Sequence, residues 1–336
     1  MMDIQSFINQ QLSFPTYALG DEEARNIAKS GIVPYLTKKL LSNRYRKSTP
    51  SPDVAASITR NIQQSVKEEK PIHLTIPLGG YKKWQLGSAP TTDWSEFFHL
   101  RYMLEYMAPV AAAYKPGVLL DYFSNGWMAK VISFYSDEDL AAYTKSFREL
   151  IDQFAGNFPP NVQISYNVVA EQKDERMLLE RTLKNRPVVE AAWQKLSDEE
   201  KREKLAYSER SIRWDRLERD RPLTADEKEK LIYEGKIIHD SLLMGGWNGD
   251  LYYLRSENGI GIIHRNSDPY FLHLATVAGS FVQFWVGTGI LEERKGRDIP
   301  RVLSYTQYMK VKNELERKDI SGVQGKNFPT IEVLRG

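Results

Sequence analysis

Two short apolar runs joined by a long helical pattern mark the centre of this chain, residues 71–124. The first run, residues 72–76, is typical of a strand and opens into a glycine and lysine loop, residues 79–83. A helix predicted to begin near Asp93 then leads to the second apolar run, residues 118–123. A strand–helix–strand crossover of this length implies parallel strands, whose carboxyl ends leave loops available for a ligand.

The pattern continues as a second helix and a third strand. A capping signature at Ser136 is followed by apolar residues at spacings of three and four through Phe154, which predicts an amphipathic helix. Residues 161–169 alternate and are rich in β-branched side chains, which predicts a strand. We therefore predict an α/β fold with a Rossmann-like, mostly parallel sheet flanked by helices.

The same patterns divide the chain into four regions. Residues 1–70 are predicted to be a helical N-terminal region, in which one helix runs over residues 21–41. Residues 71–170 form the Rossmann-like core, and residues 171–244 form a charged helical segment. Residues 245–336 are predicted to supply a hairpin and the C-terminal part of the core.

The last region carries its own turn and strand signals. An Asn-Gly turn at residues 257–259 lies between two apolar runs, residues 251–255 and 260–265, and this is a strong hairpin signal. We expect the hairpin to add antiparallel strands at the far side of the sheet. A last helix is predicted over residues 304–316, followed by an extended tail at residues 330–334.

Charge is balanced along the chain. Residues 197–236 hold 11 basic and 12 acidic residues, a net charge of −1, which fits ion pairs on exposed helix faces. The whole chain has 46 basic and 44 acidic residues and a net charge of +2, so no nucleic-acid partner is predicted. A partner-binding surface on the charged helices stays an alternative to an enzyme.

The cysteine content and the signal-peptide and membrane-span patterns of the sequence indicate where in the cell the protein is expected. The chain has no cysteine, which excludes disulfides, thiolate metal sites and a cysteine nucleophile. The N-terminus lacks a basic stretch followed by an apolar one, so we expect no signal peptide and a cytoplasmic protein. Residues 271–291 carry no charged side chain and are long enough to span a bilayer. His273, Gln283 and three glycines in this segment favour buried core, so no membrane partner is expected.

Metal and nucleotide motifs are absent from the sequence. The five histidines show no HExxH pattern, and His239 and Asp240 project about 100° apart on a helix, so no bound metal is predicted. An iron site with two histidines and a carboxylate from distant positions stays open. Residues 79–83 match neither the dinucleotide nor the P-loop spacing, so no cofactor is predicted.

The loop after the first strand is the first candidate site. Its two glycines allow backbone N–H groups to approach an anion, and either lysine can supply charge or an amine nucleophile. We therefore assign Gly79, Gly80 and Tyr81 to substrate or phosphate binding, and Lys82 and Lys83 to catalysis. The alternative is a glycine turn with two solvated lysines.

Further candidates lie at strand and helix ends. Asp121 ends a central strand, where α/β ligands bind and where burial raises a carboxyl pKa, so we assign it to catalysis. His264 and Arg265 end another predicted strand and point to opposite faces, which suggests a catalytic histidine and an anion-binding arginine. Arg210 and Arg213 lie three apart on one predicted helical face and can clamp a phosphate. Ordinary salt bridges are the alternative for these arginines.

Several motifs occur together in residues 71–155. They are Leu86-Gly87, Pro90, the helix start Asp93-Trp94-Ser95-Glu96, the turn Tyr114-Lys115-Pro116-Gly117 and the strand end Ser124-Asn125-Gly126. In this combination the stretch resembles the isonitrile synthase family of the pyoverdine and dityrosine biosynthesis type. The family's Lys-Ser-Pro-Asn loop is replaced here by residues 79–83. Ser124 stands at the family's strand end and is assigned to substrate binding.

The resemblance implies a cytoplasmic enzyme of specialised metabolism. Such an enzyme converts the amino group of an amino acid, typically an aromatic one, into an isonitrile and takes the carbon from a sugar phosphate such as ribulose 5-phosphate. It needs no organic cofactor or metal. Lys82 or Lys83 with an arginine would hold phosphate, and Asp121 or His264 would move protons. The alternative is a related α/β enzyme for another amino acid or phosphorylated metabolite, with or without iron.

Overall fold

The computed structural model describes residues 16–86, 90–172, 174–244, 259–264, 271–320 and 330–335. The helices are α2 (Asp21–Ser30), α3 (Ile32–Leu40), α4 (Pro52–Lys67), η1 (Trp84–Leu86), α5 (Trp94–Ala113), α6 (Gly126–Ser133), α7 (Asp137–Ala155), α8 (Val169–Gln172), α9 (Glu175–Gln194), α10 (Asp198–Glu209), α11 (Trp214–Leu217), α12 (Ala225–Leu242), η3 (Phe284–Val286), α13 (Tyr305–Val311) and η4 (Lys312–Glu314). The strands are β1 (Ile72–Leu78), β2 (Val118–Ser124), β3 (Val162–Val168), β4 (Ile260–Ile263), β5 (Leu272–His273), β6 (Gly287–Arg294), β7 (Arg297–Ser304), β8 (Leu315–Asp319) and β9 (Thr330–Leu334).

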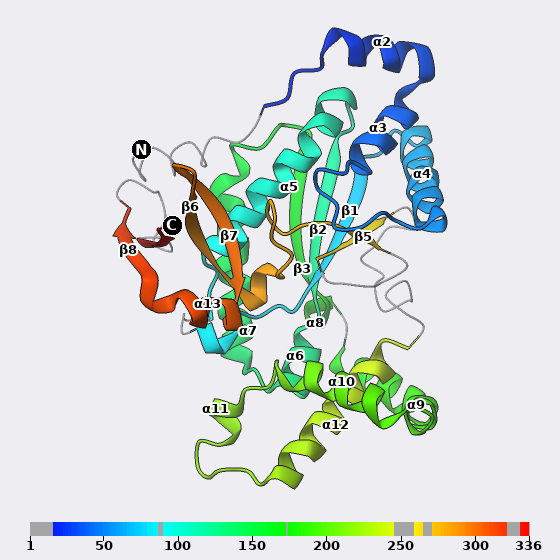
Figure 1. Cartoon of the computed structure of the whole chain (residues 1–336). Helices are drawn as coiled ribbons and strands as arrows, with labels where there is room; N and C mark the ends of the chain where they lie inside the picture. The colour runs from blue at the N-terminus through cyan, green and yellow to red at the C-terminus, as the bar shows by residue number, and fades with distance from the viewer. Residues whose placement is uncertain are drawn as a thin grey trace.

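A five-stranded parallel sheet with the order β3-β2-β1-β4-β5 forms the centre of the molecule (Figure 1). The predicted strand–helix–strand–helix–strand series supplies β1, β2 and β3, and the predicted fold class is confirmed. Strand order reverses between β1 and β4, because the chain first adds strands on one side of β1 and then on the other. In open α/β sheets, ligands bind outside the carboxyl ends of the strands at such a switch point.

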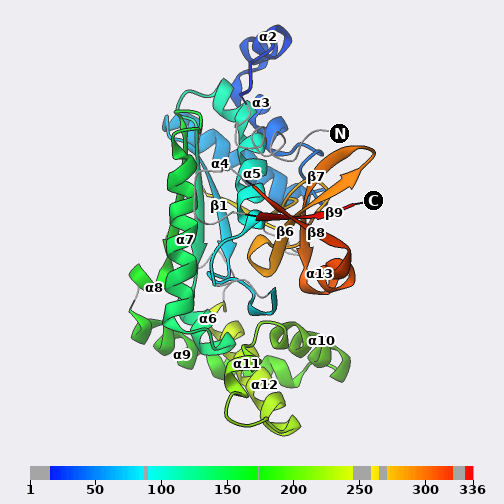
Figure 2. The ribbon, with the colours of Figure 1, turned by 90° about the vertical axis from the view of Figure 1, so that its left-hand side faces the viewer.

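Helices α5 and α7 pack on the face of the sheet that carries Tyr122. The Tyr122 hydroxyl and His99 Nε2 of α5 are 3.0 Å apart, and the Tyr122 and Phe147 rings have centroids 5.2 Å apart. Helix α5 is apolar on nearly all sides because it lies between this sheet and β6 (Figure 2). Its capping box of Asp93 and Glu96 forms as the sequence predicts.

A second sheet of four strands, with the order β7-β6-β9-β8, covers the outer side of α5. Strands β6 and β7 form an antiparallel hairpin, and β9 pairs in parallel with β6. The predicted extended tail becomes β9. At Gly289 a Cβ would lie 2.3 Å from the backbone nitrogen of Ser95, so the missing side chain allows β6 to approach the start of α5.

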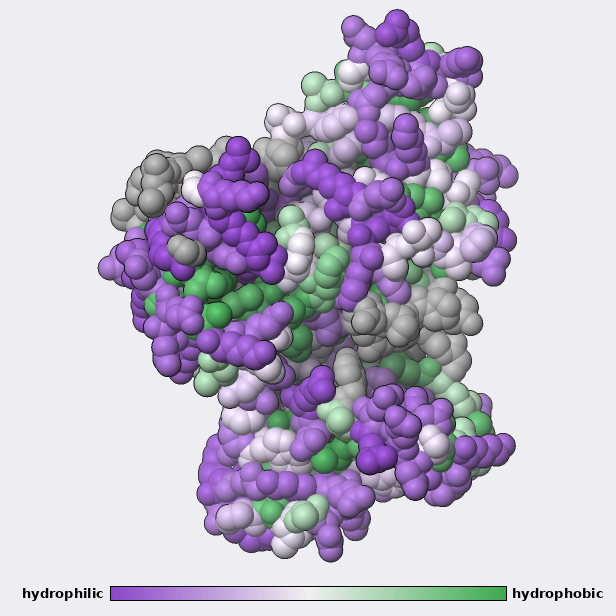
Figure 3. Space-filling model, in the orientation of Figure 1, coloured by the Kyte–Doolittle hydropathy of each residue, from purple (hydrophilic) through white to green (hydrophobic). Residues whose placement is uncertain are grey.

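Helices α9 to α12 gather beyond the carboxyl ends of the parallel strands (Figures 1 and 2). The capping boxes at Ser197 and Thr224 start α10 and α12, as their sequences predict. Hydrophilic side chains dominate the visible face of this region (Figure 3), which fits its balanced charge. Its inner side packs against α6, where Gly235 of α12 lies close to the Ile132 carbonyl.

Three sequence-based expectations are corrected here. The helix predicted over residues 21–41 is interrupted at Gly31, which has φ 83° in the left-handed region that glycine tolerates. The helix predicted over residues 304–316 is shorter, since α13 ends at Val311 and Glu316 belongs to β8. Residues 251–255 lie outside the described part of the chain, and β4 pairs in parallel with β1 and β5 instead of antiparallel.

The uncharged segment at residues 271–291 is divided among β5, η3 and β6. Most of its apolar side chains, Phe284 and Leu291 among them, are buried in the main core. Among the described residues, no helix is both long and apolar enough to cross a membrane. The preference for buried core over a span is therefore confirmed for this segment.

Candidate active site

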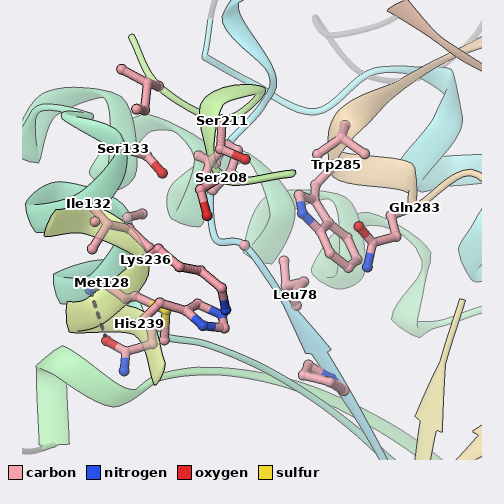
Figure 4. A pocket seen from close by; sticks show the side chains of 18 of the residues that line it. Leu78, Met128, Ile132, Ser133, Ser208, Ser211, Lys236, His239, Gln283 and Trp285 are labelled. Atoms are coloured by element: carbon pink, nitrogen blue, oxygen red, sulfur yellow. Dashed lines mark hydrogen bonds between the residues drawn. The ribbon is translucent and has the colours of Figure 1, made fainter. Parts of the chain in front are cut away.

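A cavity of about 170 Å³ lies between the carboxyl ends of β1, β2 and β4 and the inner sides of α6 and α12 (Figure 4). It is at the switch point of the sheet. Most of its wall is apolar or aromatic. The lining residues include Leu78, Gly79, Tyr81, Phe123, Asn125, Ser133, Ser208, Ser211, Lys236, His239, His264, Gln283 and Trp285. A cavity with apolar walls and a few convergent polar groups is typical of a small-molecule site.

His264 follows β4 directly and is 1% exposed. Its Nδ1 lies 3.0 Å from the carbonyl oxygen of Leu274. Because a carbonyl only accepts, Nδ1 carries the hydrogen and Nε2 of the neutral ring holds a lone pair. Nε2 has no hydrogen-bond partner among the described residues. Burial lowers the His264 pKa to about 4, so the ring is uncharged at neutral pH and Nε2 keeps its lone pair.

Asn125 follows β2 and supplies a donor to the same wall. It is 8% exposed and is the N-cap of α6, where its Oδ1 accepts a hydrogen bond of 3.1 Å from the Met128 backbone. This bond fixes the amide orientation, so Nδ2 is directed elsewhere and lacks a partner within the described chain. A buried polar atom without a partner is costly, and two residues of the cavity lining carry one each, which suggests a ligand site.

The helical wall of the cavity carries Lys236 and His239 of α12. Figure 4 shows both on one side of the cavity, with Leu78, Gln283 and Trp285 opposite. His239 Nδ1 lies 2.9 Å from Asp240 Oδ1, and Lys236 pairs with the same carboxylate. Hydrogen bonds from His239 and Lys236 outweigh the effect of burial and hold the Asp240 pKa at about 2.

Aromatic rings form the wall at the end of β1. Tyr81 stacks on Tyr135 with ring centroids 4.2 Å apart, and Trp285 lies beside it. A Cβ at Gly79 would lie 2.6 Å from the Tyr81 ring and 2.8 Å from the Trp285 nitrogen. Gly79 and Tyr81 therefore line the cavity, as the assignment to substrate binding requires.

Lys82 turns away from the cavity into a buried network. Its side chain is 1% exposed, and Nζ lies 2.7 Å from Ser95 Oγ and 3.0 Å from Glu96 Oε2. Nζ also lies 2.9 Å from Asp93 Oδ1 and 3.1 Å from the Phe284 carbonyl. Lys82 thus joins the start of α5 to η3, and the structure gives it a stabilising position instead of the assigned catalytic one.

Lys83 and Arg210 lie close enough to interact electrostatically, and each is near a cavity-lining residue in sequence, Tyr81 and Ser211 respectively. Burial, and then the charge of Arg210, lower the Lys83 pKa. Neither side chain has an acidic partner in the described part of the chain. An anion bound between two neighbouring cations would be stabilised by both charges. This pair is compatible with the phosphate-binding role assigned from sequence.

Arg213 does not share a helical face with Arg210. Helix α10 ends at Glu209, and Arg213 is the N-cap of α11, so the predicted two-arginine clamp is wrong. The Arg213 guanidinium lies 2.7 Å from Asp139 and 2.7 Å from Asp215, and it packs over the Tyr135 ring. Arg213 therefore forms ordinary salt bridges with Asp139 and Asp215.

Asp121 belongs to the opposite face of the sheet from Tyr122. It is 4% exposed and accepts hydrogen bonds of 2.8 Å from Ser165 and 2.6 Å from Asn167. His73 Nε2 lies 3.4 Å from its other oxygen. Asp121 is therefore apart from the cavity and does not converge with His264, while Arg265 lies outside the described residues.

Ser124 and Gly80 meet beneath the loop. Ser124 Oγ lies 2.8 Å from the Tyr166 hydroxyl and is buried, so it supports the loop and does not line the cavity. Gly80 has φ 75°, and a Cβ there would lie 2.7 Å from Ser124 Oγ. Both residues assigned to substrate binding hold the cavity wall in place.

Replacing Gly80 by alanine should therefore destabilise the protein. A left-handed φ at a residue with a Cβ costs about 1–3 kcal/mol, and the contact with Ser124 adds to it. Urea unfolding measures the loss. Gly156→Ala is the matched control, because Gly156 ends α7 with φ −65° and has open space around it. Equal unfolding midpoints for both variants would contradict this account of the loop.

The sequence reading missed Asn125, His239 and Trp285. Asn125 is readable as an N-cap signal, but capping alone does not tell that the residue lines a cavity. Neighbouring helical positions project in different directions, which argued against a shared role for His239 and Asp240. In the structure, however, His239 Nδ1 and Asp240 Oδ1 lie 2.9 Å apart. Within the described chain, no group of three or more histidine or acidic side chains is placed to hold a metal ion.

Fold and site together define an α/β protein with a Rossmann-like sheet and a small-molecule cavity at its switch point. Among solved structures, the PvcA protein from Pseudomonas aeruginosa has a similar fold, with a TM-score of 0.64 and 14% sequence identity. The match covers 90% of this chain and 100% of that chain. No family model and no curated protein matches the sequence. At this identity the likeness shows the shared fold.

Proposed function

We propose that this protein is a biosynthetic enzyme that binds an amino acid in the cavity at the switch point and acts on its amino group. The observation that carries the proposal is that two lining residues, His264 and Asn125, each hold a buried polar atom, Nε2 and Nδ2, without a hydrogen-bond partner in the described chain. One accepts or removes a proton and the other donates a hydrogen bond. An amino acid offers the matching groups, an amine to the acceptor and a carboxylate to the donor.

The remaining wall fits an aromatic side chain. Tyr81, Phe123 and Trp285 supply ring surfaces, and aromatic pairs gain about 0.5–1.5 kcal/mol beyond their buried area. An aromatic amino acid would therefore place its ring among these residues and its polar end toward β2 and β4. This is the substrate class that the sequence resemblance implies.

The chemistry proposed is isonitrile formation with a sugar phosphate as carbon donor. Its first step joins the substrate amine to the ketone of ribulose 5-phosphate as an imine and releases water. The amine attacks only when neutral, and His264 Nε2 is placed to take its proton. Lys83 and Arg210 would hold the phosphate. The resemblance of residues 71–155 and the fold shared with PvcA both support this proposal.

The resemblance also carries the expectation of a cytoplasmic enzyme without cofactor or metal. A related α/β enzyme for another amino acid or phosphorylated metabolite, with or without iron, stays an alternative prediction. A partner-binding surface on the charged helices also stays an alternative prediction. Two of these helices, α12 and the end of α10, supply Lys236, Ser208 and other residues to the cavity wall.

Isothermal calorimetry with L-tyrosine and ribulose 5-phosphate tests the proposal. We expect saturable binding of L-tyrosine and weaker or no binding of 3-(4-hydroxyphenyl)propionate, which lacks the amine. Ribose 5-phosphate, an aldose isomer, is the matched control for the ketone.

The reaction itself is tested with ¹⁵N-labelled tyrosine and ¹³C-labelled ribulose 5-phosphate. A new ¹³C–¹⁵N coupling in the NMR spectrum would show transfer of carbon to nitrogen. If no aromatic amino acid binds at millimolar concentration, the proposed function is wrong. If one binds and no coupling forms, the amino-acid site stands and the isonitrile reaction does not.

A further inference from the structure

A second imidazole lines the cavity on a different element from His264. His239 is in the last turn of α12, whereas His264 follows β4, and both are part of the cavity wall. The proposed reaction moves protons both away from the attacking amine and toward the departing water. One neutral histidine performs one of these transfers at a time, so a second proton-transfer group has a clear use.

The surroundings of His239 are those of an oriented imidazole. Asp240 Oδ1 lies 2.9 Å from His239 Nδ1, and a carboxylate in this position accepts the Nδ1 hydrogen. In the neutral ring this bond places the hydrogen on Nδ1, so proton exchange with a ligand would use Nε2. A negative carboxylate also stabilises the imidazolium, and Lys236 shares this carboxylate.

The two histidines therefore have opposite environments. His264 donates Nδ1–H to a neutral carbonyl in a fully buried setting, which favours the uncharged ring. His239 is half-buried and bonds to a carboxylate, which favours the charged ring. Two titratable groups whose environments push their pKa values apart are the usual arrangement of an acid and a base in one site.

We propose that His239 is the general acid of this cavity, that Asp240 is its positioning residue, and that it works opposite the general base His264. This inference rests on the proposed function. In the imine step, His264 takes a proton from the amine, and the imidazolium of His239 gives a proton to the hydroxyl that leaves as water. The carbon–nitrogen bond forms, the carbon–oxygen bond breaks, and one proton is taken up while another is released.

The other charged groups near the dyad of His239 and Asp240 come from α12, α9, α6 and α10. On α12 itself Lys236 shares the Asp240 carboxylate. From α9, Arg181 donates to the Leu242 carbonyl, and Arg186 pairs with Glu190 and Glu234. From α6, Lys130 pairs with Asp137. The α10 side chains Arg202, Glu203 and Lys204 are exposed to solvent.

The test combines turnover with NMR of the histidine rings in the full-length protein. His239→Gln should lower kcat by about 100-fold or more with a small change in KM, since the lost group acts in the reaction step. Asp240→Asn should lower kcat in the same way and shift the ¹⁵N signals of His239 to the other tautomer. Lys230→Gln is the control, an exposed residue of the same helix.

Ligand binding separates the two ways of failing. Saturating L-tyrosine should move the ring signals of both histidines. If L-tyrosine binds and His264 responds while His239 and the turnover of His239→Gln stay unchanged, the assignment of His239 is wrong and the proposed function stands. If no amino acid binds, the proposed function fails and the role of His239 falls with it.

Discussion

Replacing Lys82 by methionine should destabilise the protein by about 3–5 kcal/mol, the usual cost of removing one partner from a buried ion pair. Methionine keeps most of the side-chain length and removes the ammonium. Asp93 and Glu96 then lose their cation, and Glu96 is 0% exposed. The backbone carbonyl of Phe284 also loses one of its two donors and keeps the Ser95 hydroxyl at 2.8 Å, so one of the two bonds between η3 and the loop and start of α5 is lost. Urea unfolding monitored by tryptophan fluorescence measures the effect.

The loss should depend on pH in a defined direction. Burial raises the Glu96 pKa from the ordinary 4.5 to about 7, even though Lys82 acts to lower it. A carboxyl whose folded pKa is raised gives stability below pH 4.5 that is lost as pH rises through 7. Without Lys82 this pKa rises further, so Lys82→Met should be destabilised more at pH 8 than at pH 5.

Two further variants test the predicted role of the buried Lys82 network. Lys82→Met combined with Glu96→Gln removes both charges and should recover part of the lost stability. Lys83→Met, at the next position, should leave stability within about 0.5 kcal/mol of the wild type, because Lys83 has no ion pair within the described chain. Equal effects of the two lysine variants would show that the buried network adds nothing.

Lys82 also shows where sequence reasoning stops. Residues 79–83 correctly mark a loop at the carboxyl end of a central strand, and two adjacent lysines there suggest an anion site. Which lysine turns inward depends on the capping box at Asp93 and on the carbonyl of Phe284, about 200 residues later in the chain. No local pattern encodes that contact, so the sequence cannot tell a stabilising lysine from a catalytic one.

The fold was predictable where each element is long and periodic. Strands β1 to β3 and helices α5 and α7 follow from residues 71–170 alone, because each pattern is local. The partner of β4 was not predictable, since its four residues allow both a hairpin and a parallel strand. Gly31 was also missed, because only its backbone angle shows that it ends one helix and starts another.

The candidate site was predictable in part for the same reason. His264 ends a predicted strand, and it lines the cavity at the switch point between β1 and β4, while its assignment to catalysis stays a prediction. Asp121 has the same signal and faces another side of the sheet. A period of two gives the face of a residue relative to its neighbours, but it does not tell which face carries the ligand.

Replacing His264 by asparagine should lower kcat/KM by about 100- to 10,000-fold, because the base at the end of β4 is lost. Asparagine is the matched substitution, since its amide can still donate to the Leu274 carbonyl and hold the turn. Asn125→Ala removes only a hydrogen bond to the substrate and the cap of α6, so its effect should appear mainly in KM. Steady-state kinetics of both variants gives the comparison.

The stability of His264→Asn at acid pH provides an independent measurement. Burial lowers the folded pKa of His264 from 6.5 to about 4, so the unfolded chain binds this proton more readily than the folded protein does. The stability that depends on the neutral ring is present above pH 6.5 and is lost as pH falls toward 4. His264→Asn has no such proton to bind, so it should lose less stability between these pH values than the wild type. A variant that loses activity and resists acid better would identify His264 as a buried neutral base. A variant that keeps its activity would remove His264 from the site, and the cavity at the switch point would then act through other residues.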